Sequence, residues 1–164
     1  MQFWSLPYVP GERYLENPVY VLSGARTFSG GEDFGYTLQA LGRATIIGRT
    51  SGGGAHPTRG FPVSAGVHIA IPYARSVNPV TGTNWQGTGI VPDISVPEDE
   101  ALDVAYRKAL EHVLSTDALP PVTEEAREAL AHLPADVPAR YPAEDVPAEN
   151  VGPGAVASTR LEGV

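Results

Sequence analysis

The strongest constraint on the fold is a strand, helix and strand pattern packed into about thirty residues. Val19–Leu22 is a β-rich apolar run, typical of a strand in the middle of a parallel sheet. From about Gly31 to Leu41, apolar residues recur at helical spacing, and Gly42 follows where a left-handed C-terminal cap would lie. Ala44–Ile47 is a second apolar strand. This is the order of a right-handed crossover unit, so we predict an α/β fold.

The next segments add shorter elements around this unit. Residues 49–60 are glycine-rich and polar, and we predict an irregular loop long enough to be functional. Val67–Ile71 is a predicted strand, and Ile90 to Val96 is an extended segment whose Pro92 favours the edge of a sheet. Asp99–Leu114 has a broad apolar stripe and acidic residues at its start, which predicts a helix.

The composition changes after residue 115. We predict a core domain over residues 1–115, a short helical extension over residues 116–133 and a proline- and alanine-rich tail over residues 134–164. Thr123 is the predicted N-cap of the helix in the extension, which runs to about Leu133. The tail has few large apolar side chains to offset its ordering entropy, so we predict that it is disordered.

Charge and composition exclude several classes of function. A net charge of −8 gives no basic surface for nucleic acid. Without cysteine the chain has no thiolate nucleophile, disulfide or cysteine-ligated metal, and its four histidines lack metal-ligand spacing. We therefore expect no metal and no cofactor. No apolar run is long enough to span a membrane and the chain shows no signal peptide, so the compartment stays open.

Ser29 is the best candidate for a nucleophile. It lies between a predicted strand and a predicted helix, where free backbone N–H groups and the helix dipole point toward an oxyanion. Gly30 and Gly31 allow a substrate to approach closely. The alternative is that Ser29 only caps the helix, with Glu32 completing a capping box.

Two loops hold further candidates. Glycines 52–54 lack the Lys-Ser or Lys-Thr pair of a phosphate loop, so phosphate binding is disfavoured. His56 follows them and is either a base for Ser29 or an exposed loop histidine. Asn84, Trp85 and Gln86 either line a cleft or pack and cap their own turn.

Two segments resemble the tail-specific (C-terminal processing) serine peptidases. They are PVYVLSGARTFSGGEDFGYTLQALGRATIIGRTSGGGAHP and GTNWQGTGIVPDISV. The branch is similar to the interphotoreceptor retinoid-binding protein repeats and the tricorn protease core. The resemblance covers about Phe3 to Leu114. It implies a ClpP/crotonase-like core, with Ser29 at the position of the nucleophile and the Gly30 N–H as an oxyanion donor.

The sequence departs from the family pattern at three places. Gly54 stands where the classical members have a lysine base. The histidine base of the tricorn-like branch lies upstream of the matching region, so His56 is not its equivalent. Gln86 corresponds to that branch's glutamate and keeps hydrogen bonding without the charge. Members also carry, before this region, a glycine-rich turn with a second oxyanion donor, so the chain resembles the C-terminal part of a peptidase core.

The resemblance therefore implies a serine-type peptidase acting on a peptide or protein through an acyl-enzyme on Ser29, with Gly30, His56 and Gln86 as further site residues. The alternatives are a noncatalytic module that binds a ligand or peptide, or an inactive remnant. Because the matching region lacks a preceding half, we expect the isolated chain to need a partner or to self-associate.

Overall fold

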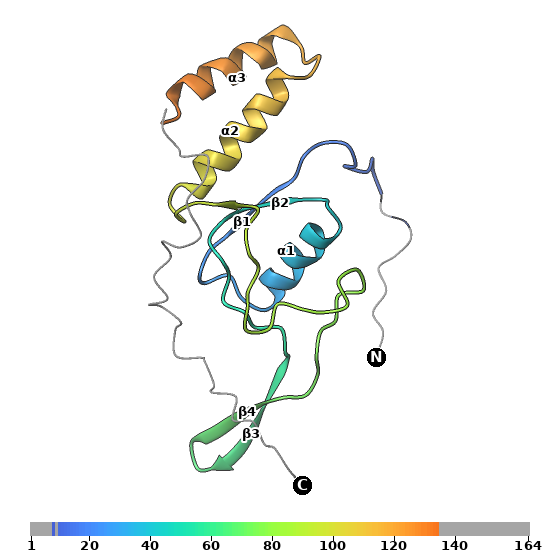
Figure 1. Cartoon of the computed structure of the whole chain (residues 1–164), viewed down its shortest axis with the longest axis vertical. Coiled ribbons are helices and arrows are strands. Elements are labelled where there is room, and N and C mark those ends of the chain that lie inside the picture. Colours follow the sequence, from blue (N-terminus) through green and yellow to red (C-terminus); the bar gives the residue numbers. More distant parts are fainter. Residues whose placement is uncertain (1–7, 9, 135–164) are drawn as a thin grey trace.

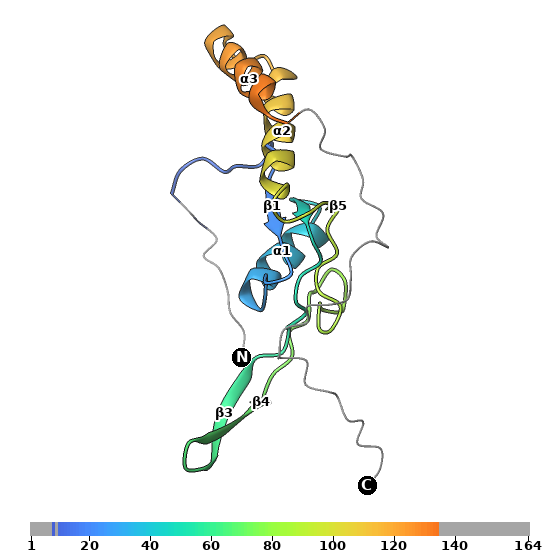
Figure 2. The same cartoon turned by 90° about the vertical axis from the view of Figure 1, so that its left-hand side faces the viewer.

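The computed structural model describes residue 8 and residues 10–134. The predicted disordered tail lies outside these residues, except for Pro134. Figures 1 and 2 show an elongated arrangement, with a helix pair at one end, a β-hairpin at the other and a small α/β unit between them.

The α/β unit has a three-stranded parallel sheet. β1 (Tyr20–Ser23) leads through α1 (Gly30–Ala40) into β2 (Thr45–Gly48), and β5 (Ile94–Ser95) pairs with the far side of β2. The predicted crossover unit is confirmed. The predicted central place for the first strand is wrong within the described residues, because β2 takes the centre and β1 lies at one edge.

β5 lies at the opposite edge, which agrees with the prediction for the proline-containing segment. The Asp93 carboxylate, just before β5, accepts the backbone N–H of Ile46 at 2.7 Å and the Gln39 amide at 3.0 Å. One side chain therefore ties β5 to β2 and to α1.

Helix α1 ends as the sequence predicts. Gly42 has φ 62°, a left-handed conformation that glycine adopts without strain. Its N–H donates to the carbonyl of Gln39, and the Arg43 N–H donates to that of Leu38 at 2.8 Å. This pair of bonds is a Schellman motif, and it turns the chain sharply into β2.

Helices cover both faces of the sheet. Ile46 and Ile47 are fully buried and, as successive strand residues, point to opposite faces. α1 packs on the Ile46 face, where its Gly35 lies against Ile46 and Ile90. α2 (Ala101–Leu114) packs on the Ile47 face through a cluster of buried side chains: Ile47, Val96, Ala101, Val104 and Ala105.

α3 (Pro120–His132) packs against α2. The predicted N-cap at Thr123 is wrong: Leu119 is the cap and Pro120 is the first helical residue. Proline suits that position because its φ is preset and it lacks an N–H that would be left unpaired. The Thr123 hydroxyl donates to the Pro120 carbonyl at 2.9 Å instead.

β3 (Thr58–Ser64) and β4 (Val67–Pro72) form an antiparallel hairpin that projects away from the helices in both views (Figures 1 and 2). The strand predicted over Val67–Ile71 is confirmed. The prediction of irregular structure up to residue 60 is wrong, because β3 begins at Thr58. Gly60 and Pro62 weaken its local strand signal, so pairing with β4 determines its conformation.

Candidate active site

Ser29 occupies a strained turn between β1 and α1. Its φ is 53°, and it is the one non-glycine residue with a positive φ in the described part of the chain. A side chain in this region costs free energy, and such strain is typical of functional sites. Serine nucleophiles at sharp strand-to-helix turns are exposed in this way, and the Ser29 side chain is exposed.

The backbone N–H of Gly30 is available beside Ser29. Gly30 is the first residue of α1, so its N–H has no acceptor within the helix, and it has none among the other described residues. The Gly31 N–H is already used, since it donates to the Phe28 carbonyl at 3.1 Å. Gly30 therefore supplies one free donor at the positive end of the helix dipole.

Glu32 is the centre of the local hydrogen-bond network, and its side chain is fully buried. Ser29 is the N-cap of α1 and the predicted capping box is present, since Glu32 accepts the Ser29 N–H at 2.8 Å. Glu32 also accepts the Ser51 hydroxyl at 2.5 Å and the N–H groups of Gly53 at 2.6 Å and Gly54 at 2.8 Å. One carboxylate thus holds the glycine loop against the turn that presents Ser29.

This role of Glu32 and the participation of Ser51 were not predicted from the sequence. A glutamate three residues after a serine predicts a cap, but the other three donors lie 19 to 22 residues away. The available signal was a carboxylate near the start of a helix followed by a glycine-rich loop, whose N–H groups are accessible donors.

Gln86 is placed beside the His56 segment. Its amide oxygen accepts the N–H of Ala55 at 2.8 Å and that of His56 at 3.2 Å. The imidazole of His56 and the hydroxyl of Ser29 share no hydrogen bond in the part of the chain that the structure describes. The structure thus joins Gln86 to the backbone of His56, and leaves the ring of His56 unconnected to Ser29.

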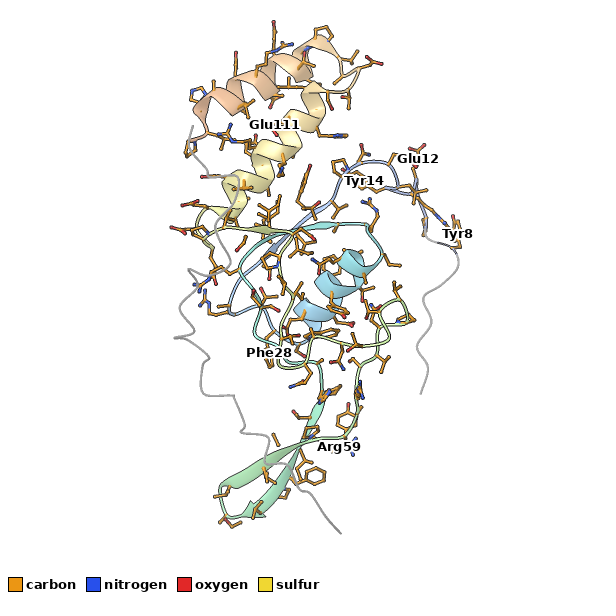
Figure 3. All side chains as sticks on the ribbon, viewed as in Figure 1. Tyr8, Glu12, Tyr14, Phe28, Arg59 and Glu111 are labelled. Carbon is orange, nitrogen blue, oxygen red and sulfur yellow. The ribbon has the colours of Figure 1, made fainter. Side chains whose placement is uncertain are left out.

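Gly54 lies against Phe28. A Cβ built on Gly54 would be 2.0 Å from Cζ of the Phe28 ring, and one on Gly52 would be 2.8 Å from its Cδ2. The ring therefore lies on the glycine loop, yet 59% of Phe28 is exposed. Figure 3 shows Phe28 at the side of the α/β unit that faces the hairpin.

Asn84 and Trp85 pack and cap their own turn, which is the simpler of the two roles predicted for this segment. Trp85 is 2% exposed, and its ring centroid lies 5.3 Å from that of Tyr36. The Asn84 side chain donates to the Ser76 carbonyl at 2.7 Å and accepts the Gln86 N–H at 3.0 Å. Trp85 and Asn84 thereby fix the turn that presents Gln86.

An open cavity of about 500 Å³ lies beside the C-terminal end of β1, apart from Ser29. It is lined by Leu22, Ser23, Gly24, Arg26, Thr27, Glu98 and Ala101. Among the residues described, no three acidic or histidine side chains gather as a metal site would require. No helix within the described ranges has the length and apolar character needed to cross a membrane.

Ser29 thus lies exposed on a strained strand-to-helix turn, beside a backbone N–H that has no acceptor among the described residues. The family model of Peptidase family S41 matches residues 8–96, and the chain belongs to this family. The resemblance to C-terminal processing peptidases is thereby confirmed.

Solved structures that are similar to the chain include two that we describe here. A "photosystem II D1 C-terminal processing protease" is 24% identical, with a TM-score of 0.45, over 65% of this chain and 27% of that one. "Mature CPAF" is 21% identical, with a TM-score of 0.52, over 68% of this chain and 23% of that one. The likeness to the second supports the fold. The chain spans only these fractions of either protein's length.

Proposed function

We propose that the chain is part of a serine-type peptidase core in which Ser29 is the nucleophile and the Gly30 N–H is an oxyanion donor. The observation that carries this proposal is the positive φ of Ser29, 53°, at the junction of β1 and α1. A cap needs no such strain, because N-cap residues usually adopt β-region dihedrals. The family membership supports the same reading.

The chemistry is acyl transfer. The Ser29 oxygen attacks the peptide carbonyl carbon and loses its proton to a base while the carbonyl oxygen becomes an oxyanion beside the Gly30 N–H. The C–N bond then breaks, and the amine leaves with the proton. Water attacks the resulting ester, which releases the acid and restores the Ser29 hydroxyl.

We propose His56 as the base within this chain and Gln86 as the residue that positions it. Support comes from the loop geometry, since Gln86 fixes the His56 backbone and Glu32 fixes the adjoining Gly53 and Gly54. Catalytic hydrogen bonds are often long without substrate and tighten when it binds.

We also propose that residues 1–115 form the C-terminal part of the catalytic core and that further polypeptide, or a second copy, completes it. The described sheet has three strands, and its outer strands β1 and β5 each have one unpaired edge. The similar structures are longer, since the chain covers 27% and 23% of them. Residues 116–133 and 134–164 are then an extension and a tail.

The test is intact-mass detection of fluorophosphonate labelling of Ser29. Wild type is compared with Ser29→Ala and with Ser64→Ala, a matched loss of an exposed serine in the hairpin. Labelling that disappears only in Ser29→Ala supports the proposal. The assay is repeated with the upstream part of a family core added, and absence of labelling in both forms would refute it.

A second candidate function is a noncatalytic ligand- or peptide-binding module, as in the retinoid-binding branch that the sequence resembles. It is favoured by position 54, which holds a glycine covered by the Phe28 ring and so supplies no lysine base. This candidate predicts a folded chain that never labels at Ser29 yet binds an apolar ligand or peptide.

A further inference from the structure

Helix α1 carries a largely exposed row of apolar side chains, which we call the α1 stripe: Phe34, Leu38 and Leu41. They recur at i, i+4 and i+7, so they line one side of the helix. Phe34 and Leu41 are 59% and 60% exposed, although both are large and apolar. The residue of α1 that packs on Ile46 in the core is Gly35. An exposed apolar row of this kind is typical of a docking surface.

The α1 stripe lies on the flank of the helix that faces away from β5. On the other flank, the Gln39 amide donates to the Val91 carbonyl and to the Asp93 carboxylate, which lie just before β5. Each helical residue turns about 100° around the axis, so Gln39 points about 100–160° away from the three residues of the stripe. β1 and β5 are the two outer strands of the sheet. The α1 stripe is therefore on the β1 side.

The chain that leads into β1 is held at one end of the α1 stripe. The Arg43 guanidinium donates to the Tyr14 carbonyl at 2.5 Å and lies 5.7 Å from the centre of the Tyr14 ring. Arg43 is two residues beyond Leu41, the last residue of the stripe. From Tyr14 the chain continues toward the N-terminus past Glu12 to Tyr8 (Figure 3). The N-terminal residues thus start from the Leu41 end of the stripe.

The sequence of residues 1–7, MQFWSLP, matches the α1 stripe in chemistry and spacing. These residues lie outside the described part of the chain, and they include four large apolar side chains and no charged one. In an extended segment, Trp4 and Leu6 lie on the same face, about 6.6 Å apart along the chain. Phe34 and Leu38 are about 6 Å apart along the axis of α1. An extended segment can therefore place one apolar side chain on each of them.

The connection is long enough for this placement. Six residues separate Tyr8 from Tyr14, so these two lie at most about 20 Å apart, whereas residues 1–7 extend about 23 Å. Gly11, between them, has φ 98°, a conformation that lets the chain reverse its direction. Pro7 and Pro10 favour an extended backbone at the residue before each. Tyr8 is 72% exposed, so its side chain does not hold residues 1–7 to another surface.

We infer that residues 1–7 of the chain dock in an extended conformation on the α1 stripe. Trp4 packs on Phe34, and Leu6 packs between Leu38 and Leu41, so the segment runs from the C-terminal end of α1 toward its N-terminal end. The docked segment removes the exposed apolar row from water and covers the flank of the α/β unit on the β1 side. The inference does not depend on the proposed peptidase function.

The test is disulfide formation in the full chain, which has no cysteine of its own. The double variant Leu6→Cys, Leu41→Cys is compared with Leu6→Cys, Leu102→Cys under mild oxidation. Leu102 lies on α2 and is 63% exposed, so it matches Leu41 in residue type and exposure. Because a disulfide requires Cα atoms about 4–7 Å apart, we expect an intramolecular bond to form about tenfold faster at position 41 than at position 102. Intact mass and non-reducing electrophoresis measure it.

Tryptophan fluorescence gives a second readout without cysteines. The chain has two tryptophans, and Trp85 is 2% exposed, so quenching by acrylamide reports mainly on Trp4. We expect Phe34→Ser to raise the quenching constant about threefold, because the indole of Trp4 loses its apolar contact. Phe61→Ser on the hairpin replaces a phenylalanine that is 43% exposed and should leave quenching unchanged. Circular dichroism checks that both variants keep the fold.

Three results would overturn the inference. Equal rates of disulfide formation at positions 41 and 102 would show that residues 1–7 do not lie on the α1 stripe and leave it to another partner. Disulfides that join two chains at position 41 would show that a second copy covers the stripe instead. Equal quenching of wild type and Phe34→Ser would show that Trp4 has no contact there.

Discussion

The ring of Phe28 fills the space that a side chain at position 54 would occupy, with 2.0 Å between Cζ of Phe28 and the Cβ that Gly54 lacks. The aromatic residue before Ser29 and the glycine in the following loop are thus structurally coupled. A side chain at position 54 therefore requires the Phe28 ring to move.

Gly54→Ala is expected to lower the free energy of unfolding by about 1–3 kcal/mol, because the new methyl group overlaps the Phe28 ring. In the double variant Phe28→Ala, Gly54→Ala, the methyl group no longer meets a ring. Chemical denaturation of both single variants and the double variant gives the coupling energy.

Gly60→Ala is the matched control for Gly54→Ala. A Cβ there meets nothing within 4 Å, and Gly60 is an exposed strand residue without a positive φ. We expect the free energy of unfolding of Gly60→Ala to stay within about 0.5 kcal/mol of that of wild type. Equal destabilisation at positions 54 and 60, or strictly additive effects of the Phe28 and Gly54 substitutions, would contradict the overlap.

Glu32→Gln is expected to destabilise the fold by about 3 kcal/mol or more. The new amide group is a donor, so one end of the side chain would face N–H and O–H groups that it cannot satisfy. Thermal and urea unfolding measure the loss. Glu125→Gln on the exposed face of α3 is the control and should leave stability unchanged, whereas similar stabilities for the two variants would show that Glu32 is not required.

Gln86→Ala is expected to destabilise the chain by about 1 kcal/mol, because the N–H groups of Ala55 and His56 lose their shared acceptor. Gln86→Glu keeps a side-chain oxygen that can accept both N–H groups, so its free energy of unfolding should stay within about 0.5 kcal/mol of that of wild type. Hydrogen exchange at the Ala55 and His56 amides measures this directly. Unchanged protection in the alanine variant would argue against Gln86 as the group that fixes this loop.

The phenol of Tyr20 ionises less readily in the folded chain than in the unfolded chain. Burial, with a smaller contribution from the Glu111 carboxylate, raises the pKa of Tyr20 above its ordinary value of 10.0. Because the pKa is higher in the folded state than in the unfolded state, this contribution to stability is complete below pH 10.0 and is lost as pH rises through the folded pKa.

The Tyr20 effect is measured as the unfolding free energy at about pH 8 and about pH 10.5. Wild type should lose more stability between these values than Tyr20→Phe, which has no phenol to ionise. Tyr8→Phe alters a side chain that is 72% exposed and should behave as wild type. Parallel pH profiles for wild type and Tyr20→Phe would show that burial of Tyr20 is not linked to its ionisation.

The sequence predicts those parts of the fold that depend on neighbouring residues. The first crossover unit follows from apolar spacing, and its helix end follows from Gly42, because both signals are local. The strand character of Thr58–Ser64 is not predictable in this way, since Gly60 and Pro62 oppose it and only pairing with β4 stabilises it.

The residues of the candidate site likewise differ in whether neighbouring sequence predicts them. Ser29 and Gly30 were predicted from their place between a strand and a helix, and the structure puts them there. The network of Glu32 was not, because its donors come from a loop that the fold brings back to α1. Local sequence shows that a carboxylate follows the serine, and only three-dimensional proximity shows what it binds.

The burial of Glu32 also affects the order in which the molecule folds. In the unfolded chain its carboxylate is hydrated, and removing that water without replacement donors is costly. α1 therefore gains little by docking on the sheet before residues 51–54 arrive with their hydroxyl and N–H groups. We therefore expect helix docking and closure of the glycine loop to occur as one cooperative event, which disfavours intermediates that retain the core but lack an assembled Ser29 turn.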